Sequence, residues 1–296
     1  MCSSDLVSDR TGMMVGAGLG SGATIFGIGA GIGGYRNHRS RKIAQARAEM
    51  AIVGKEYGEL ASRLDQIDIQ AHSLTSPFAN ATMRHQWEEV RDRFFNMHNQ
   101  VDALGNLTSQ SPDEKYLEQA DAIRQAAVTT REVSYAEDNI DKLYRLEHGD
   151  DVVRRTELQA LRDDVVEAQV ALDDAKSGLY RELQNLRERA DSLMNSTQSP
   201  DFLDQYVILL GDYRTALEQL RKQKFDDLDE SENTALAAPG ITSPDYRVGY
   251  GYNNFVPFWA LSTWHSTNSA AQSAGGSSAN TGFSSGFSGA GGSSSF

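Results

Sequence analysis

The chain has 296 residues and a net charge of −13, which makes nucleic acid an unsuitable partner for the chain as a whole. Cys2 is the only cysteine, which excludes an intrachain disulfide and a metal site built from cysteines. Glycine, serine and aromatic residues gather at the two ends, whereas nearly all of the charge lies between Arg36 and Arg247. This distribution predicts a charged middle region between two segments of different composition.

The first twelve residues are expected to be a leader, and the first six of them have a separate explanation. MCSSDL is the translation of GTG-TGC-TCT-TCC-GAT-CT, the end of a common short-read sequencing adapter, with GTG taken as the start codon. We therefore expect residues 1–6 to be adapter-derived and the natural protein to continue upstream of Val7. On this interpretation the chain is a carboxy-terminal fragment.

The stretch from Met13 to Tyr35 contains no charged residue. As a helix, residues 13–35 would be about 35 Å long at roughly 1.5 Å per residue, which is enough to cross a bilayer. We therefore predict a single transmembrane helix in the cell membrane. The alternative is a flexible glycine linker, because so many glycines weaken both the helix and its insertion.

The residues in and after this stretch support the transmembrane interpretation. A basic cluster follows directly, consisting of Arg36, Arg39, Arg41 and Lys42. Such a flank favours the cytoplasmic side for the following residues and attracts anionic lipids. Small-xxx-small pairs, which allow transmembrane helices to approach closely, are formed by Gly16 with Gly20 and by Gly27 with Gly31.

The same stretch also contains a G-x-G-x-x-G pattern at Gly29, Gly31 and Gly34. A dinucleotide site requires these glycines to follow a strand and to open a helix within a βαβ unit. The preceding residues are as glycine-rich as the pattern itself, and the next hundred residues are helical in pattern. A nucleotide cofactor is therefore not expected.

From Ile43 onward, apolar residues recur three and four positions apart, which is the heptad pattern of coiled coils. The series predict about five long helices, with apolar positions over residues 43–74, 83–104, 120–143, 158–193 and 203–220. The strongest seam positions are Met50, Val53, Tyr57, Leu60, Leu64, Ile67, Trp87, Val90, Phe94, Leu161, Val165 and Leu172. The sequence thus predicts an all-α cytoplasmic region over residues 36–226.

Further details of the pattern bear on how these helices pack. Short links between long helices favour antiparallel hairpins or a bundle. The step from Leu179 to Leu183 is interpreted as a stutter within one continuous helix. The mixed charges of LRDDVVEAQ, residues 161–169, are interpreted as part of an exposed face. Whether the seams close within one chain or between chains is left open.

Residues 227–296 are expected to contain an acidic linker, an aromatic segment and a low-complexity tail. The segment NNFVPFWALSTW contains Phe255, Phe258, Trp259 and Trp264, which would lie at a membrane interface or dock on the helical body. The end of the chain, GFSSGFSGAGGSSSF, is rich in glycine and serine and is expected to be disordered.

The chain offers no recognisable catalytic, cofactor or metal site. It contains no G-x-x-x-x-G-K-[ST], H-E-x-x-H or G-x-S-x-G motif. His85 and Glu89 share a helical face but are too few to bind a metal. A polar cluster around Gly149, with members Glu147, His148, Asp150 and Asp151, is explained either by calcium or zinc binding or by a capped turn between helices.

The order of these segments resembles the carboxy-terminal half of actinobacterial membrane proteins with an amino-terminal TPM domain, including coiled-coil relatives from corynebacteria and mycobacteria. The matching segments are Met13–Tyr35, Arg36–Lys42 and Gly282–Phe296. The resemblance implies a signal peptide and an extracytoplasmic TPM domain upstream. None of that family's phosphatase-type or metal-binding residues can be carried over, because the segment that bears them is absent from this chain.

These observations predict a membrane-anchored coiled-coil structural or interaction protein, without enzymatic activity in this fragment. Its expected partners are membrane lipids and either a second copy of itself or a helical protein. One alternative is the carboxy-terminal part of a TPM-domain enzyme whose catalytic domain lies upstream. Another is a peripheral membrane-stress scaffold resembling the phage-shock coiled-coil proteins, in which the glycine run is a linker.

Overall fold

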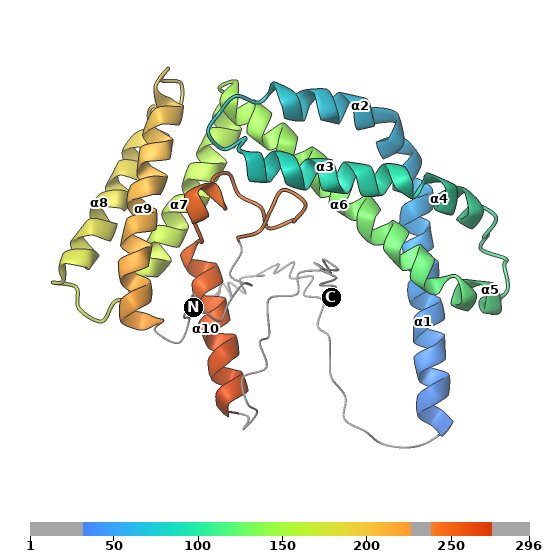
Figure 1. Cartoon of the computed structure of the whole chain (residues 1–296). Coiled ribbons are helices and arrows are strands. Elements are labelled where there is room, and N and C mark those ends of the chain that lie inside the picture. Colours follow the sequence, from blue (N-terminus) through green and yellow to red (C-terminus); the bar gives the residue numbers. More distant parts are fainter. Residues whose placement is uncertain (1–31, 226–237, 274–296) are drawn as a thin grey trace, which may run out of the picture. The chain divides into compact units, whose positions relative to one another are not determined.

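The computed structural model describes residues 32–225 and 238–273, and every regular element within these ranges is helical (Figure 1). The all-α prediction is therefore confirmed. The chain divides into two units, Met1–Ser40 and Arg41–Phe296. The packing described below lies within the second unit.

Most of the predicted transmembrane segment falls outside the described residues. Only residues 32–35 of the 13–35 stretch are described, and they form the start of the first helix. Gly16, Gly20, Gly27 and Gly31 likewise lie outside the described residues. Among the helices over residues 32–225 and 238–273, none combines the length and the apolar character that a bilayer crossing requires.

The described helices, in chain order, are α1 (Ile32–Ile52), the π-helical turn η1 (Val53–Tyr57), α2 (Gly58–Ser73), α3 (Ala81–Asn96), α4 (His98–Leu104), α5 (Asp113–Glu118), α6 (Ala120–Glu147), α7 (Asp151–Val170), α8 (Gly178–Met194), α9 (Phe202–Lys224), the 3-10 turn η2 (Tyr252–Asn254) and α10 (Phe258–Ser273). The predicted second helix is interrupted at Met97. The predicted third helix corresponds to α6, and the short helix α5 precedes it with a break at Gln119.

The prediction of one continuous fourth helix with a stutter was wrong. Helix α7 ends at Val170, and α8 begins at Gly178 after a turn. The hydroxyl of Ser177 caps α8 by accepting a hydrogen bond from the Tyr180 N–H at 3.0 Å. The chain reverses between these two helices through residues 171–177, ALDDAKS, whereas the irregular step from Leu179 to Leu183 lies inside α8.

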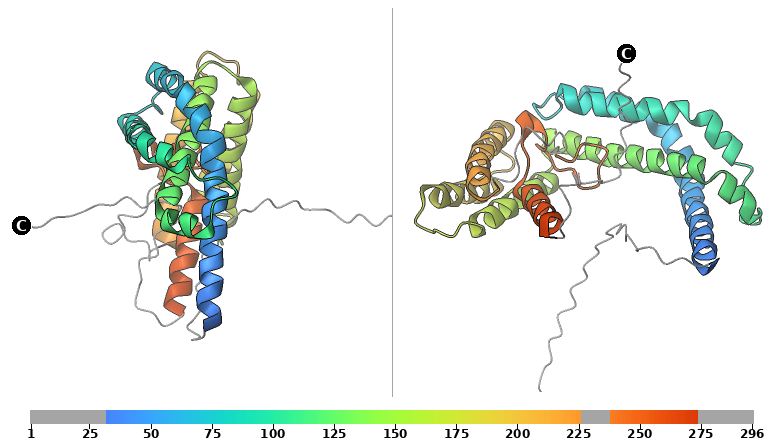
Figure 2. Two further views of the ribbon diagram at one scale, coloured as in Figure 1. Left: turned by 90° about the vertical axis from the view of Figure 1, so that its right-hand side faces the viewer. Right: turned by 60° about the horizontal axis from the view of Figure 1, so that its bottom comes forward.

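The helices pack in two groups that are joined by the connection between α6 and α7. In the first group α6 packs against η1, α2 and α3; in the second, α7, α8 and α9 lie side by side (Figures 1 and 2). Because consecutive helices of the second group are joined by short connections, they run antiparallel, as the short links predicted.

The predicted seam positions face the interior of this single chain. Nine of them are buried: Val53, Tyr57, Leu60, Ile67, Trp87, Val90, Phe94, Leu161 and Val165. The other three, Met50, Leu64 and Leu172, are partly buried and pack against the same core. The seams therefore close within one chain, which answers the question that the periodicity left open.

The polar cluster around Gly149 forms a capped turn. Gly149 has a φ of 84°, in the left-handed region that glycine adopts at low cost. The Asp150 carboxylate accepts hydrogen bonds from the N–H groups of Val152 and Val153 at 3.0 and 3.1 Å, and thereby caps α7. Within the described ranges no group of His, Cys, Asp and Glu residues is arranged to hold a metal ion.

We expect Leu60→Asp to destabilise the protein by about 3 kcal/mol or more, because a carboxylate would replace a side chain that is 2% exposed between α2 and α6. The matched control is Ile69→Asp in the same helix, at a side chain that is 71% exposed. This control should change stability by less than about 1 kcal/mol. Urea unfolding followed by circular dichroism measures both, and equal effects would contradict the assignment of the buried face.

Candidate functional site

Residues 238–257, which we call the C-terminal strap, pack into the helical body together with α10. Ile241, Tyr246, Val248 and Phe255 of the strap are each less than 5% exposed. The aromatic residues singled out in the sequence also pack against the helical body, because Phe258 and Trp264 are buried and Trp259 is half-buried. Of the two interpretations of the aromatic segment, docking on the helical body is the one that the structure shows.

Helix α6 holds the first half of the strap through its backbone carbonyl groups. The Asn139 amide nitrogen donates hydrogen bonds to the carbonyls of Ile241 and Ser243, each at 2.9 Å. One turn later, the Lys142 ammonium donates to the carbonyl of Tyr246 at 3.2 Å. Both side chains thus satisfy strap carbonyls that would otherwise be buried without a donor.

Glu157 of α7 holds the middle of the strap. Its side chain is 2% exposed and accepts a hydrogen bond from the Val248 N–H at 2.9 Å. Two cations flank the carboxylate, with Lys142 Nζ at 4.0 Å and the Arg247 guanidinium at 3.5 Å. Burial lowers the pKa of Lys142, and the charge of Glu157 opposes that shift. The Tyr206 hydroxyl completes the attachment by donating to the carbonyl of Val248 at 3.3 Å.

Asp164, two turns further along α7, fixes the start of α10. Its carboxylate accepts hydrogen bonds from the N–H groups of Phe258 and Trp259 at 2.8 and 3.0 Å and from the Tyr213 hydroxyl at 2.7 Å. A carboxylate in this position satisfies the first N–H groups of a helix and interacts favourably with its dipole. Burial raises the pKa of Asp164 to about 6, against the effect of the three donors.

The position of Asp164 corrects the sequence analysis. The segment LRDDVVEAQ was interpreted as an exposed face, but Asp164 is only 6% exposed, whereas its neighbour Asp163 points to solvent. The reason is that α7 contacts α8 and α9 as well as α10, so that its buried surface is wider than one apolar stripe.

Two glycines in the strap stand where a side chain would not fit. A Cβ on Gly240 would lie 2.5 Å from the Gln86 amide oxygen, which also accepts a hydrogen bond from the Ile241 N–H at 3.1 Å. A Cβ on Gly249 would lie 2.5 Å from Leu210, and the φ of Gly249 is 96°. The strap can therefore approach α3 and α9 closely.

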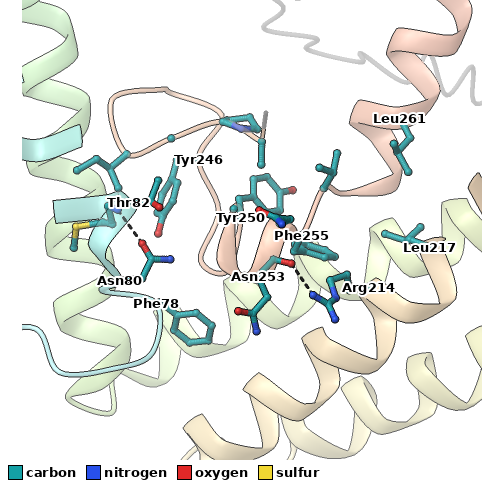
Figure 3. Close-up of a pocket in the computed structure, with 18 of the residues that line it drawn as sticks. Phe78, Asn80, Thr82, Arg214, Leu217, Tyr246, Tyr250, Asn253, Phe255 and Leu261 are labelled. Atoms are coloured by element: carbon teal, nitrogen blue, oxygen red, sulfur yellow. Dashed lines mark hydrogen bonds between the residues drawn. The ribbon is translucent and has the colours of Figure 1, made fainter. Parts of the chain in front are cut away.

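The strap, α3, α9 and α10 surround a cleft of about 530 Å³, which is within the range of roughly 300–1,000 Å³ that is typical of ligand sites (Figure 3). Its lining includes the apolar and aromatic side chains of Phe78, Tyr246, Tyr250, Phe255, Leu261 and Trp264, together with the charged side chains of Arg214, Glu218 and Arg221. Amide and hydroxyl side chains also border it, namely Asn80, Thr82, Gln86, Asn253 and Asn254.

The turn at the edge of the cleft has an unusual backbone. Asn253 and Asn254 have φ values of 49° and 60°, a region that asparagine tolerates better than most residues. The Arg214 guanidinium of α9 donates a hydrogen bond to the Asn253 carbonyl at 2.7 Å (Figure 3). This bond ties the turn to α9, and both asparagine side chains stay exposed beside the cleft.

The site residues predicted from the sequence do not come together at this cleft. The described seam residues are distributed through the core, and Arg39, Arg41 and Lys42 are exposed on α1. Periodicity gave no indication of the cleft, although the turn-forming sequence GYGYNN could have suggested a constrained loop at residues 249–254. The cleft combines apolar rings with amide, hydroxyl and charged side chains. No protein-family model, curated protein or solved structure matches this chain.

Asp164 should make stability depend on pH in a defined direction. Its folded-state pKa of about 6 lies above the ordinary value of 3.8, so the folded state binds more protons between these values. The contribution of Asp164 to the free energy of unfolding is therefore fully present below about pH 4 and is lost as the pH rises through 6. The stability difference between the wild type and Asp164→Asn should fall by about 2–3 kcal/mol over this interval.

Urea unfolding at a series of pH values measures this difference. Asp163→Asn is the matched control, because Asp163 is the exposed neighbour of Asp164 on the same helix. The control should not show the same fall. A difference for Asp164→Asn that rises with pH, or that stays constant, would contradict the description of the buried carboxylate.

Proposed function

We propose that this chain is a membrane-anchored helical interaction protein whose body binds a partner at the cleft. The observation that carries the proposal is the closure of the seams within one chain. Seam residues such as Val53 and Leu161 pack against helices of the same chain and are not free to join a second one. A partner must therefore meet another surface, and the cleft is a concave candidate whose walls are both apolar and polar.

Anchoring is supported by the uncharged stretch of residues 13–35 and by the basic residues that follow it. Arg36, Arg39, Arg41 and Lys42 all lie on α1, where Arg41 and Lys42 are exposed. Basic side chains beside an anionic bilayer contribute about 1 kcal/mol each. The uncharged stretch would hold the protein in the bilayer, and the basic residues would fix its orientation.

A carbonate wash of membranes that contain residues 7–296 tests the anchoring. We expect the protein to stay in the membrane pellet, and its C-terminal residues to be protected from protease in intact spheroplasts. Ile28→Arg should shift the protein toward the soluble fraction, because an arginine at the centre of a transmembrane helix costs about 2.5–3.5 kcal/mol.

Ile208→Arg provides the matched control for this experiment. Ile208 lies on α9 and is 56% exposed, so the same substitution there should leave the protein in the pellet. Release of the wild type by carbonate would contradict anchoring. It would favour the peripheral scaffold, in which the glycine run is a linker.

A further inference from the structure

The chemistry of the cleft indicates what it binds. Aromatic rings make up much of its apolar lining, and Arg214, Glu218 and Arg221 are its charged members. Arg214 donates to the Asn253 carbonyl, its Nε lies 3.7 Å from the Glu218 carboxylate, and Arg221 at the same edge also has a partner. Besides this charged edge, the cleft offers a ligand aromatic rings and neutral amides. Such a surface suits an uncharged, extended chain that carries large apolar side chains.

The protein contains such a chain at its own end. Residues 274–296 have no acidic or basic side chain. Their large apolar residues are Phe283, Phe287 and Phe296, and the residues between them are glycine, serine and alanine. Small residues allow the backbone to approach a surface closely, and the separated phenylalanines provide side chains for an apolar cleft.

The geometry of α10 brings this tail within reach of the cleft. Leu261 and Trp264 of α10 line the cleft, and the helix continues to Ser273. The nine residues from Trp264 to Ser273 extend about 14 Å at a rise of 1.5 Å per residue. The ten residues from Ser273 to Phe283 span up to about 33 Å when extended, which is more than enough to return along the helix.

We propose that residues 274–296 fold back along α10 and place a phenylalanine side chain in the cleft of the same molecule. A connection of this length would give an effective concentration in the millimolar range, which favours contacts that are too weak to form between separate molecules. The tail then acts as an internal competitor. This regulatory role rests on the proposed function, because the partner must displace the tail. Occupancy of the cleft by the tail does not depend on the proposed function.

Reactivity of a cysteine at the edge of the cleft tests occupancy in the full chain. With Cys2 changed to Ser, Thr82→Cys introduces a thiol at an exposed position that lines the cleft. We expect a bulky maleimide to react with this thiol at least about fivefold more slowly when the tail is intact than when its three phenylalanines are changed to serine, because the tethered tail competes for the cleft.

Thr215→Cys on α9 is the matched control, since Thr215 is exposed but does not line the cleft. Its reactivity should be the same with both tails. Equal rates at Thr82→Cys for the two tails would overturn the proposal. Protection that is lost on dilution would assign the occupant to a second copy, and would overturn it as well. Because no partner or membrane is needed, failure here is distinguishable from failure of the anchoring experiment.

Discussion

Two carboxylates buried on one face of α7 attach the C-terminal strap and α10 to the helical body. Glu157 and Asp164 lie two helical turns apart, and each is almost completely removed from solvent. A buried charge is tolerated only where donors or cations compensate its lost hydration. Here the compensation comes largely from the C-terminal part of the chain, through the N–H groups of Val248, Phe258 and Trp259. The helical body and the strap therefore depend on each other for stability.

This dependence explains how the cleft is formed. The strap crosses from Gln86 and Asn139 in the first helical group to Tyr206 and Arg214 in the second. Its backbone hydrogen bonds set the path of the chain, and its apolar side chains cover the core. The cleft is the space that remains between the strap, α3 and α9. Its walls thus come from segments far apart in the sequence, and its shape depends on the attachment of the strap.

Apolar periodicity correctly predicted which helix positions are buried along a single apolar stripe. The same prediction failed where a helix is covered on more than one side. Apolar residues three and four apart identified buried positions on α2, α3 and α7, including Leu60 and Trp87. The same criterion treats every acidic residue as solvated, and so it placed Asp164 on an exposed face. It also could not distinguish a stutter from the reversal between Val170 and Gly178, because two packed helices present the same apolar pattern. The cleft was not predictable, since it depends on contacts between distant segments.

The most direct test of this account is hydrogen exchange at the amides of Val248, Phe258 and Trp259 in the full chain. These N–H groups are bonded to Glu157 and Asp164. If the strap and the helical body unfold together, the three amides should exchange as slowly as the central amides of α7, at the free energy of global unfolding. Exchange at the rate of an exposed turn, while α7 stays protected, would show that the strap opens by itself and would contradict the account.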